Sequence, residues 1–245
     1  MKTVSPWCSF LLLPLGLLGC RSAPAPVACP PAGEAVRYQV TFTGAWTERT
    51  HPLDYPRAGL LSGPHLSGLI GASHDQRWSL FAAGRPPSAG LERLSEEGKH
   101  SPLDGEIRAA LASGAALELF ETGPIKDLSS PTAATVQAEV TLDAAHPMVS
   151  LAAMIAPSPD WFAGVADVRL LEEGQWVERK ELTVFAWDSG GDRGTTYEAP
   201  DADTDPKDPT VINDSRHFLR DGQRVPVAKV VFTRRRAGAR APDAP

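Results

Sequence analysis

Three aspartates stand in glycine- and proline-containing segments of a kind that often binds a cation. Asp188 and Asp192 lie four residues apart in Trp187-Asp-Ser-Gly-Gly-Asp-Arg-Gly194, which contains three glycines. Glycine adopts the left-handed backbone that a tightly curled loop needs, so both carboxylates can face one point. Asp160 lies in a second such segment, Pro157-Ser-Pro-Asp-Trp-Phe-Ala-Gly164. Because Ca²⁺ collects roughly six to eight oxygens from carboxylates, carbonyls and water, a shared cation site is one interpretation.

The same residues also suit a purely structural role. Aspartate side chains hydrogen-bond to nearby backbone amides, so Asp188 and Asp192 can form Asx-turns while Asp160 caps a bend. In a β-sandwich the loops at one end of the two sheets lie close together, so residues as distant in sequence as Asp160 and Asp188 can share a site. The spacing alone leaves both interpretations open.

A catalytic alternative begins from Gly71-Ala-Ser-His-Asp75, where serine, histidine and aspartate are adjacent. Neighbours in an extended segment point to opposite faces, whereas the members of a catalytic triad converge in space. The chain contains no His-Glu pair that would begin an H-E-x-x-H zinc helix, and no P-loop. We therefore expect no enzyme, and keep a hydrolase that uses Ser73 or His74 as the alternative.

The elements that must position these residues are mostly strands. Helical periodicity is weak and is confined to Ser88–Glu97 and Leu103–Ala112. No segment alternates strand and helix, so short strands separated by long Pro- and Gly-rich loops predict an all-β, antiparallel sandwich with one or two short helices in loops. Alternating or β-branched runs that predict strands are found at Tyr38–Thr43, Thr135–Leu142, Met148–Ile155, Val165–Leu171, Trp176–Phe185 and Val225–Thr233.

The first residues have the order of a secretory signal. Lys2 precedes a hydrophobic run from Ser9 to Leu18 that is too short to span a bilayer. Leu17-Leu18-Gly19-Cys20 resembles the lipobox of bacterial lipoproteins, which implies cleavage before Cys20 and a diacyl anchor on its sulfur. We expect a signal peptide over 1–19 and an exported chain that its lipid holds on a membrane of the bacterial cell envelope.

The remainder divides into three parts by composition. Residues 20–35 are rich in Pro and Ala and suit an extended tether, residues 36–235 form the folded domain, and residues 236–245 form a disordered tail. With Cys20 lipidated, Cys29 has no intrachain partner, so no disulfide is expected.

The charge of the chain bears on its partners. A net charge of −6 and a pI near 5.5 argue against a nucleic-acid binder, which would present a basic stripe. One basic cluster occurs, and we interpret it as a solvated tail rather than a phosphate or headgroup patch; it comprises Arg234, Arg235, Arg236 and Arg240.

Several segments, in the same order, resemble the spondin amino-terminal domain of the extracellular proteins F-spondin and mindin. The resemblance covers about Val36 to Arg235, and the paired S-P-D-W and W-D-x-G-x-D motifs are its most specific parts. The matching segments are Tyr38–Trp46, Thr50–Pro56, Leu69–His74, His146–Ser150, Pro157–Phe162, Trp187–Asp192 and Val227–Phe232.

This resemblance implies a fold and a ligand. The family's domain is an eight-stranded antiparallel sandwich related to calcium-dependent phospholipid-binding domains, with one Ca²⁺ held by aspartates of the two motifs. Carried over to this sequence, the ligands are Asp160, Asp188 and Asp192. The cysteines that the animal proteins have between these motifs are absent from Leu170–Gln175, so a disulfide there is not implied.

The function expected from the sequence is that of a surface-anchored binding or adhesion module whose Ca²⁺ fixes the loops at one end. Its partner would be a surface glycan or a protein, in addition to the membrane that holds the lipid at Cys20. Two alternatives remain: the calcium-dependent hydrolase, and a structural spacer in the envelope with no ligand beyond the metal.

Overall fold

The computed structural model describes residues 34–57 and 63–236. The signal segment 1–19, Cys20, all but the last two residues of the tether and all but Arg236 of the tail lie outside the described residues. No helix within the described ranges is long and apolar enough to cross a membrane. The long elements are β1 (Val36–Gly44), β2 (His65–His74), α1 (Ala89–Glu97), α2 (Leu103–Ala112), β3 (Ala116–Ile125), β4 (Thr135–Leu142), β5 (Met148–Ala156), β6 (Trp161–Arg169), β9 (Arg179–Val184) and β14 (Ala228–Arg235).

Short strands complete the two main sheets and form two small hairpins. β10 (Ala186–Asp188) and β11 (Val211–Ile212) extend the second sheet. The hairpins are β7 (Leu171–Glu172) with β8 (Gln175–Trp176), and β12 (Leu219–Arg220) with β13 (Gln223–Arg224).

The first main sheet has the order β4-β1-β14-β9 and is antiparallel throughout. Its strands alternate between buried and partly exposed residues, as Tyr38, Val40 and Phe42 of β1 show. Successive side chains of a strand point to opposite faces, so this sheet buries one face and leaves the other polar.

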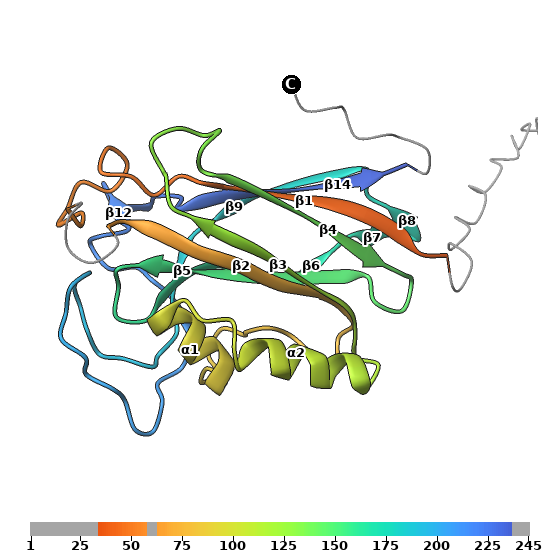
Figure 1. Cartoon of the computed structure of the whole chain (residues 1–245), viewed down its shortest axis with the longest axis horizontal. Helices are drawn as coiled ribbons and strands as arrows, with labels where there is room; N and C mark the ends of the chain where they lie inside the picture. The colour runs from red at the N-terminus through yellow and green to blue at the C-terminus, as the bar shows by residue number, and fades with distance from the viewer. Residues whose placement is uncertain (1–33, 58–62, 237–245) are drawn as a thin grey trace, which may run out of the picture.

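The second main sheet has the order β11-β10-β6-β5-β2-β3 and is buried on both faces at its centre. Every residue of β5 is buried. Val149 and Leu151 pack in the core between the sheets, whereas Ala152 packs beneath the helices with Leu94 and Ile107. Figure 1 shows the two sheets stacked, with α1 and α2 lying along the outer side of the second sheet.

The predicted all-β sandwich with short helices is confirmed. The strands predicted at Thr135–Leu142 and Met148–Ile155 and the helix at Leu103–Ala112 appear with the same or nearly the same bounds. Helix α1 follows Ser88, whose hydroxyl accepts a hydrogen bond from the Leu91 amide and so caps the helix. Eight of the described strands have six or more residues, and β10 and β11 add to them.

Two long strands were not predicted, and one was placed too late. β2 contains Gly68, Gly71 and Ser73 and is buried on both sides, so it lacks the alternation by which a half-exposed strand is recognised. β3 contains Pro124 near its end at the edge of the sheet, where proline is tolerated. The strand expected from Val165 begins at Trp161, because Trp161 pairs with Asp188 of β10.

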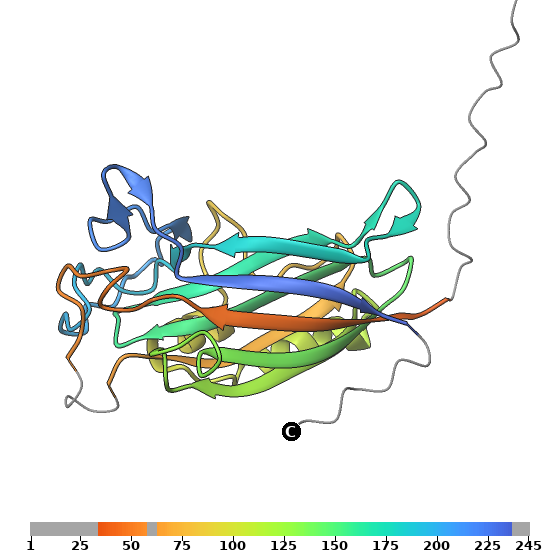
Figure 2. The same cartoon turned by 90° about the horizontal axis from the view of Figure 1, so that it is seen from above.

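The interpretation of the arginines as a solvated tail is wrong for Arg234 and Arg235. Both belong to β14, where Arg235 pairs with Arg37 and Arg234 with Tyr38 of β1. We call the end of the sandwich where β1 begins and β14 ends the tether end. The opposite end, with the loops at 157–160 and 189–210, is the loop end (Figures 1 and 2).

Candidate metal centre

Asp160 lies in the loop that joins β5 to β6 and is completely buried. Its Oδ2 accepts hydrogen bonds from the Ser189 hydroxyl at 2.9 Å and from the amides of Gly190 and Gly191, both at 2.8 Å. The amide of Asp192 adds a longer bond of 3.2 Å. Its other oxygen, Oδ1, is buried and has no hydrogen-bond partner among the described residues. Such an oxygen is expensive to leave unpaired.

The loop after β10 wraps around this carboxylate. Gly190 has a φ of +87°, a conformation that residues with a side chain rarely adopt, and a Cβ there would lie 2.1 Å from the carbonyl oxygen of Asp208. The glycines that suggested a curled loop are therefore needed for the loop to close on Asp160.

Asp188 is brought to the same place by strand pairing. It lies opposite Trp161, the first residue of β6, which puts it beside Asp160, the last residue of the preceding loop. Its Oδ1 accepts from the Gly190 amide at 3.1 Å. Burial, followed by the nearby charge of Asp160, raises the pKa of Asp188 to about 7. Burial also raises the pKa of Asp160, against the lowering effect of its hydrogen bonds.

Asp192 has a different set of contacts. Its Oδ1 accepts from the Gly194 amide at 2.5 Å and its Oδ2 from the Ala202 amide at 2.6 Å. These bonds bridge two parts of the loop, and they are the turn-forming contacts that the structural interpretation expected. Asp188 therefore lies beside Asp160. The backbone amide of Asp192 also contacts Asp160, but the Asp192 carboxylate bonds to backbone amides of its own loop.

Helix α1 contributes acidic groups that the sequence analysis missed. Glu92 and Glu96, together with Asp203, form a group whose carboxylate oxygens lie within 4.8 Å of one another. Burial and then the charge of Glu92 raise the pKa of Glu96 to about 7, with a smaller contribution from Asp160. A Cβ on Gly191 would lie 2.6 Å from Glu96 Oε1, so the glycine leaves room for this carboxylate. The i, i+4 spacing of Glu92 and Glu96 was the available signal, since it places both on one helix face.

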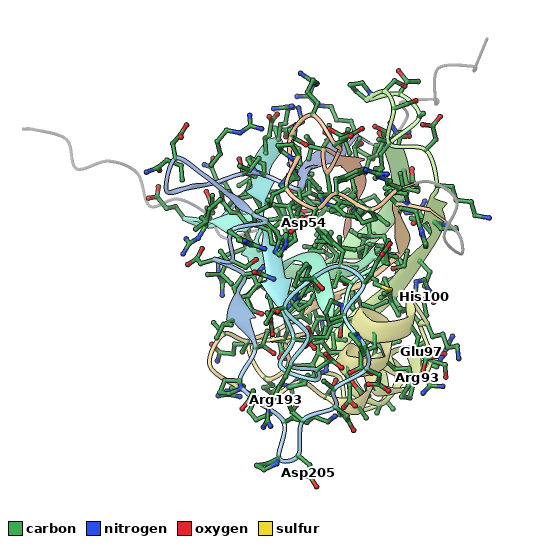
Figure 3. The ribbon with its side chains drawn as sticks, turned by 90° about the vertical axis from the view of Figure 1, so that its left-hand side faces the viewer. Asp54, Arg93, Glu97, His100, Arg193 and Asp205 are labelled. Carbon is green, nitrogen blue, oxygen red and sulfur yellow. The ribbon has the colours of Figure 1, made fainter. Side chains whose placement is uncertain are left out.

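One ammonium group partly neutralises these acids. Lys207 Nζ lies 2.9 Å from Glu92 Oε1 and also contacts Asp203. Figure 3 views the loop end directly: the loop with Asp205 at its tip extends outward near Arg193, beside helix α1 with Arg93 and Glu97. Among the described residues, the group spaced closely enough to share one metal ion is therefore Glu92, Glu96 and Asp203, and the three predicted aspartates are not brought to that spacing. Asp160 and Asp188 lie beside this group, close enough for the charge of Asp160 to raise the pKa of Glu96, and all of these side chains offer only oxygen atoms. This donor set suits a hard cation such as Ca²⁺.

The Ser73-His74 pair does not form the arrangement that a hydrolase needs. Ser73 Oγ accepts from the Glu118 amide at 3.1 Å, whereas His74 Nε2 lies 2.7 Å from Ser150 Oγ. Ser73, His74 and Ser150 are all completely buried. His74 Nε2 also lies 3.7 Å from Asp167 Oδ1, but neither serine of this cluster is open to a substrate.

Comparisons with known proteins place most of the described domain, including the loops that carry the three aspartates, in one sequence family. A family model described as Spondin_N matches residues 36–219. Spondin-2 of Rattus norvegicus is 33% identical over 229 residues, which cover 86% of this chain and 68% of that protein. Spondin-2 of Homo sapiens is 31% identical over 257 residues, 97% of this chain and 73% of that protein.

A second group of relatives is longer. Spondin-1 of Xenopus laevis is 32% identical over 220 residues, which are 84% of this chain and 26% of that protein. The family model spans the second main sheet, strands β1, β4 and β9 of the first, both helices and the three predicted aspartates. This chain belongs to the spondin amino-terminal domain family.

Proposed function

We propose that this protein is an exported, membrane-anchored lipoprotein of the cell envelope whose spondin domain is a calcium-dependent binding or adhesion module. The observation that supports the calcium site best is the pair formed by the buried Asp160 and the half-buried Asp188. Asp160 Oδ1 has no partner among the described residues, and the pKa of Asp188 is raised to about 7. Two neighbouring carboxylates, one buried and one half-buried, repel each other unless a cation or protons neutralise them.

In this proposal Asp160, Asp188 and Asp192 hold the Ca²⁺, with Glu96 as an additional ligand from helix α1. Asp160 presents Oδ1, and Asp188 presents the carboxylate next to it. Each carboxylate oxygen of Asp192 retains a lone pair beyond its amide bond. Bound Ca²⁺ would join the β5–β6 loop, the loop after β10 and helix α1, and so fix the surface on which a glycan or protein partner is recognised.

The test of the metal is a melting experiment with the metal-free protein. Added Ca²⁺ should stabilise the folded state by RT ln(1 + [Ca²⁺]/Kd), about 2.7 kcal/mol at a hundredfold excess over Kd, because only the folded chain assembles the site. Mg²⁺ should stabilise less, since it demands stricter octahedral geometry.

Two variants make this test specific. Asp188→Asn keeps the shape of the side chain, removes one charge, and should lose most of the calcium-dependent rise in melting temperature. Asp205→Asn removes an equal charge from an exposed position of the same loop and should keep the full rise. If wild type shows no rise, or if Asp188→Asn keeps all of it, the aspartates are turn formers only.

The anchor is tested separately. Cys20 has the small residue and the two leucines before it that lipidation requires in the lipobox, so Cys20→Ser should release the protein from membranes into the soluble fraction. Fractionation after a high-salt wash measures this. A Cys20→Ser protein that still sediments with membranes as wild type does would refute the lipid anchor.

A further inference from the structure

The antiparallel pairing of β1 with β14 brings the beginning and the end of the domain together. Arg37 lies opposite Arg235, and Tyr38 opposite Arg234. Figures 1 and 2 both show the first strand starting, and the last one ending, at the same end of the sandwich. The point where the tether of 20–35 meets the folded domain is therefore also the place where the arginines gather.

These arginines surround a hollow in the surface. A cavity of about 550 Å³ is lined by both termini of the domain. Its lining residues are Glu34, Ala35, Val36, Arg37, Glu178, Arg234, Arg235 and Arg236. Four arginines thus line a single opening at the end of the domain where the tether begins.

Their carboxylate partners are few and shared. Glu139 lies 3.2 Å from Arg37 and 3.6 Å from Arg235. Glu178 lies 3.2 Å from Arg234 and 3.6 Å from Arg236. Each carboxylate therefore serves two arginines, while Glu34 adds a third acid at the rim.

The pairs are also open to solvent. The side chains of Arg37 and Arg236 are 65% and 81% exposed. Exposed ion pairs contribute little free energy, so a competing anion can take their place at small cost. Guanidinium groups bind phosphate oxygens in a bidentate manner, as they bind carboxylates.

The two ends of the domain differ in which charge is in excess: at the tether end four arginines stand with three acids, Glu34, Glu139 and Glu178. The loop end contains the five acids Asp160, Asp188, Glu92, Glu96 and Asp203, of which Glu92 and Asp203 contact the ammonium group of Lys207. A negatively charged surface would repel this end and attract the other. The tether alone does not fix the orientation of the domain, because Cys20 and Glu34 are 14 positions apart and an extended chain of that length would reach roughly 40 Å.

We propose that the tether end is a docking surface for anionic phospholipid headgroups of the membrane that holds the lipid anchor. Headgroup phosphates enter the opening among Arg37, Arg234, Arg235 and Arg236, so the sandwich stands end-on with its loop end directed away from the bilayer. The diacyl anchor would hold the protein on the membrane, and the arginines would decide which end of the domain faces the bilayer. This orientation rests on the proposed anchoring at Cys20, whereas the affinity of the arginines for anionic lipid does not.

The experiment uses the Cys20→Ser protein, which contains every other residue and no lipid. Its sedimentation is measured with vesicles of phosphatidylcholine alone and with vesicles of equal parts phosphatidylcholine and phosphatidylglycerol. We expect binding to the phosphatidylglycerol vesicles only, decreasing as salt is raised. Equal binding to both vesicles, or to neither, overturns the proposal.

A matched pair of double variants assigns the binding to the arginines. Arg37→Gln with Arg236→Gln should weaken binding to phosphatidylglycerol vesicles roughly tenfold or more. Arg93→Gln with Arg216→Gln removes the same charge from exposed positions elsewhere, 48% and 71% exposed, and should bind as the parent does. Equal losses in the two double variants would show a net-charge effect and overturn the docking surface.

Two further measurements separate the possible failures. Inorganic phosphate should displace the protein from vesicles no better than chloride at matched ionic strength. Better displacement would show a site for free phosphate and overturn the assignment to lipid.

The mass of the N-terminal peptide of the wild-type protein shows whether Cys20 is acylated. An unmodified Cys20 refutes the proposed anchor and with it the end-on orientation, while the vesicle result decides the docking surface by itself.

Discussion

The two ends of this sandwich are both charged, but they differ in how their charges are solvated. At the loop end Asp160 is completely buried, and the pKa values of Asp188 and Glu96 are both raised to about 7. At the tether end Arg37 and Arg236 are largely in water and share carboxylates. Burial couples charge to folding, so the loop end should control stability and respond to pH and metal. Exposure leaves the tether end free to exchange its partners.

The largest effect that this comparison predicts is at Asp160. Asp160→Ala removes the acceptor for Ser189, Gly190 and Gly191 and leaves buried donors unpaired. We expect a loss of about 3 kcal/mol or more in the free energy of unfolding of the metal-free protein, measured by urea denaturation. Asp205→Ala, at an exposed position of the same end, should change it by less than about 0.5 kcal/mol. Equal losses would remove the distinction between buried and exposed acids.

A smaller effect concerns pH. Asp188 binds a proton more tightly in the folded chain, because burial and Asp160 raise its pKa from 3.8 to about 7. Ionised Asp188 therefore destabilises the folded state. This destabilisation is absent below about pH 4 and complete above about pH 7, so the melting temperature of the metal-free protein should rise as pH is lowered from about 8 to about 5.

Variants test which groups cause this dependence. Asp188→Asn should flatten the plot of melting temperature against pH, and Glu96→Gln should flatten it further, since the pKa of Glu96 is raised to about 7 as well. Saturating Ca²⁺ should remove the rise at acid pH, because protons and metal compete for the same carboxylates. A slope that Asp188→Asn leaves unchanged would locate the titrating group elsewhere.

The smallest effect is at the tether end. Arg37→Gln with Arg236→Gln breaks two exposed ion pairs, one to Glu139 and one to Glu178. The free energy of unfolding should change by less than about 1 kcal/mol, because exposed pairs exchange one set of water contacts for another. Urea denaturation measures this as well. A loss as large as that of Asp160→Ala would show that these arginines hold the sandwich together, and the contrast between the ends would fail.

Much of the fold could be predicted because its signals are local. The alternation of Tyr38, Val40 and Phe42 and the cap at Ser88 are visible in short windows of sequence. β2 could not be recognised in this way, because helices cover one of its faces and the other sheet covers the second. Whether a strand is covered on one side or two depends on segments far away in the chain.

The site shows the same division. The glycines of the loop after β10 and the aspartates around them predict a turn that can gather carboxylates, and the turn forms with Gly190 at a φ of +87°. The spacing did not reveal that the Asp192 carboxylate faces Gly194 and Ala202. It also did not reveal Glu96, which lies 64 residues before Asp160 in the chain.

The sequence by itself determined the alternating strands, the helix cap, the glycine-rich loop and the family to which the chain belongs, since each depends on residues close together or on motifs in a fixed order. The tertiary structure alone decided that Asp188 lies beside Asp160, that α1 brings Glu96 close enough for the charge of Asp160 to raise its pKa, and that Arg235 stands opposite Arg37. The physical reason is that strand register and the packing of α1 on the sheet are long-range contacts, which follow from burying both faces of the second sheet at once.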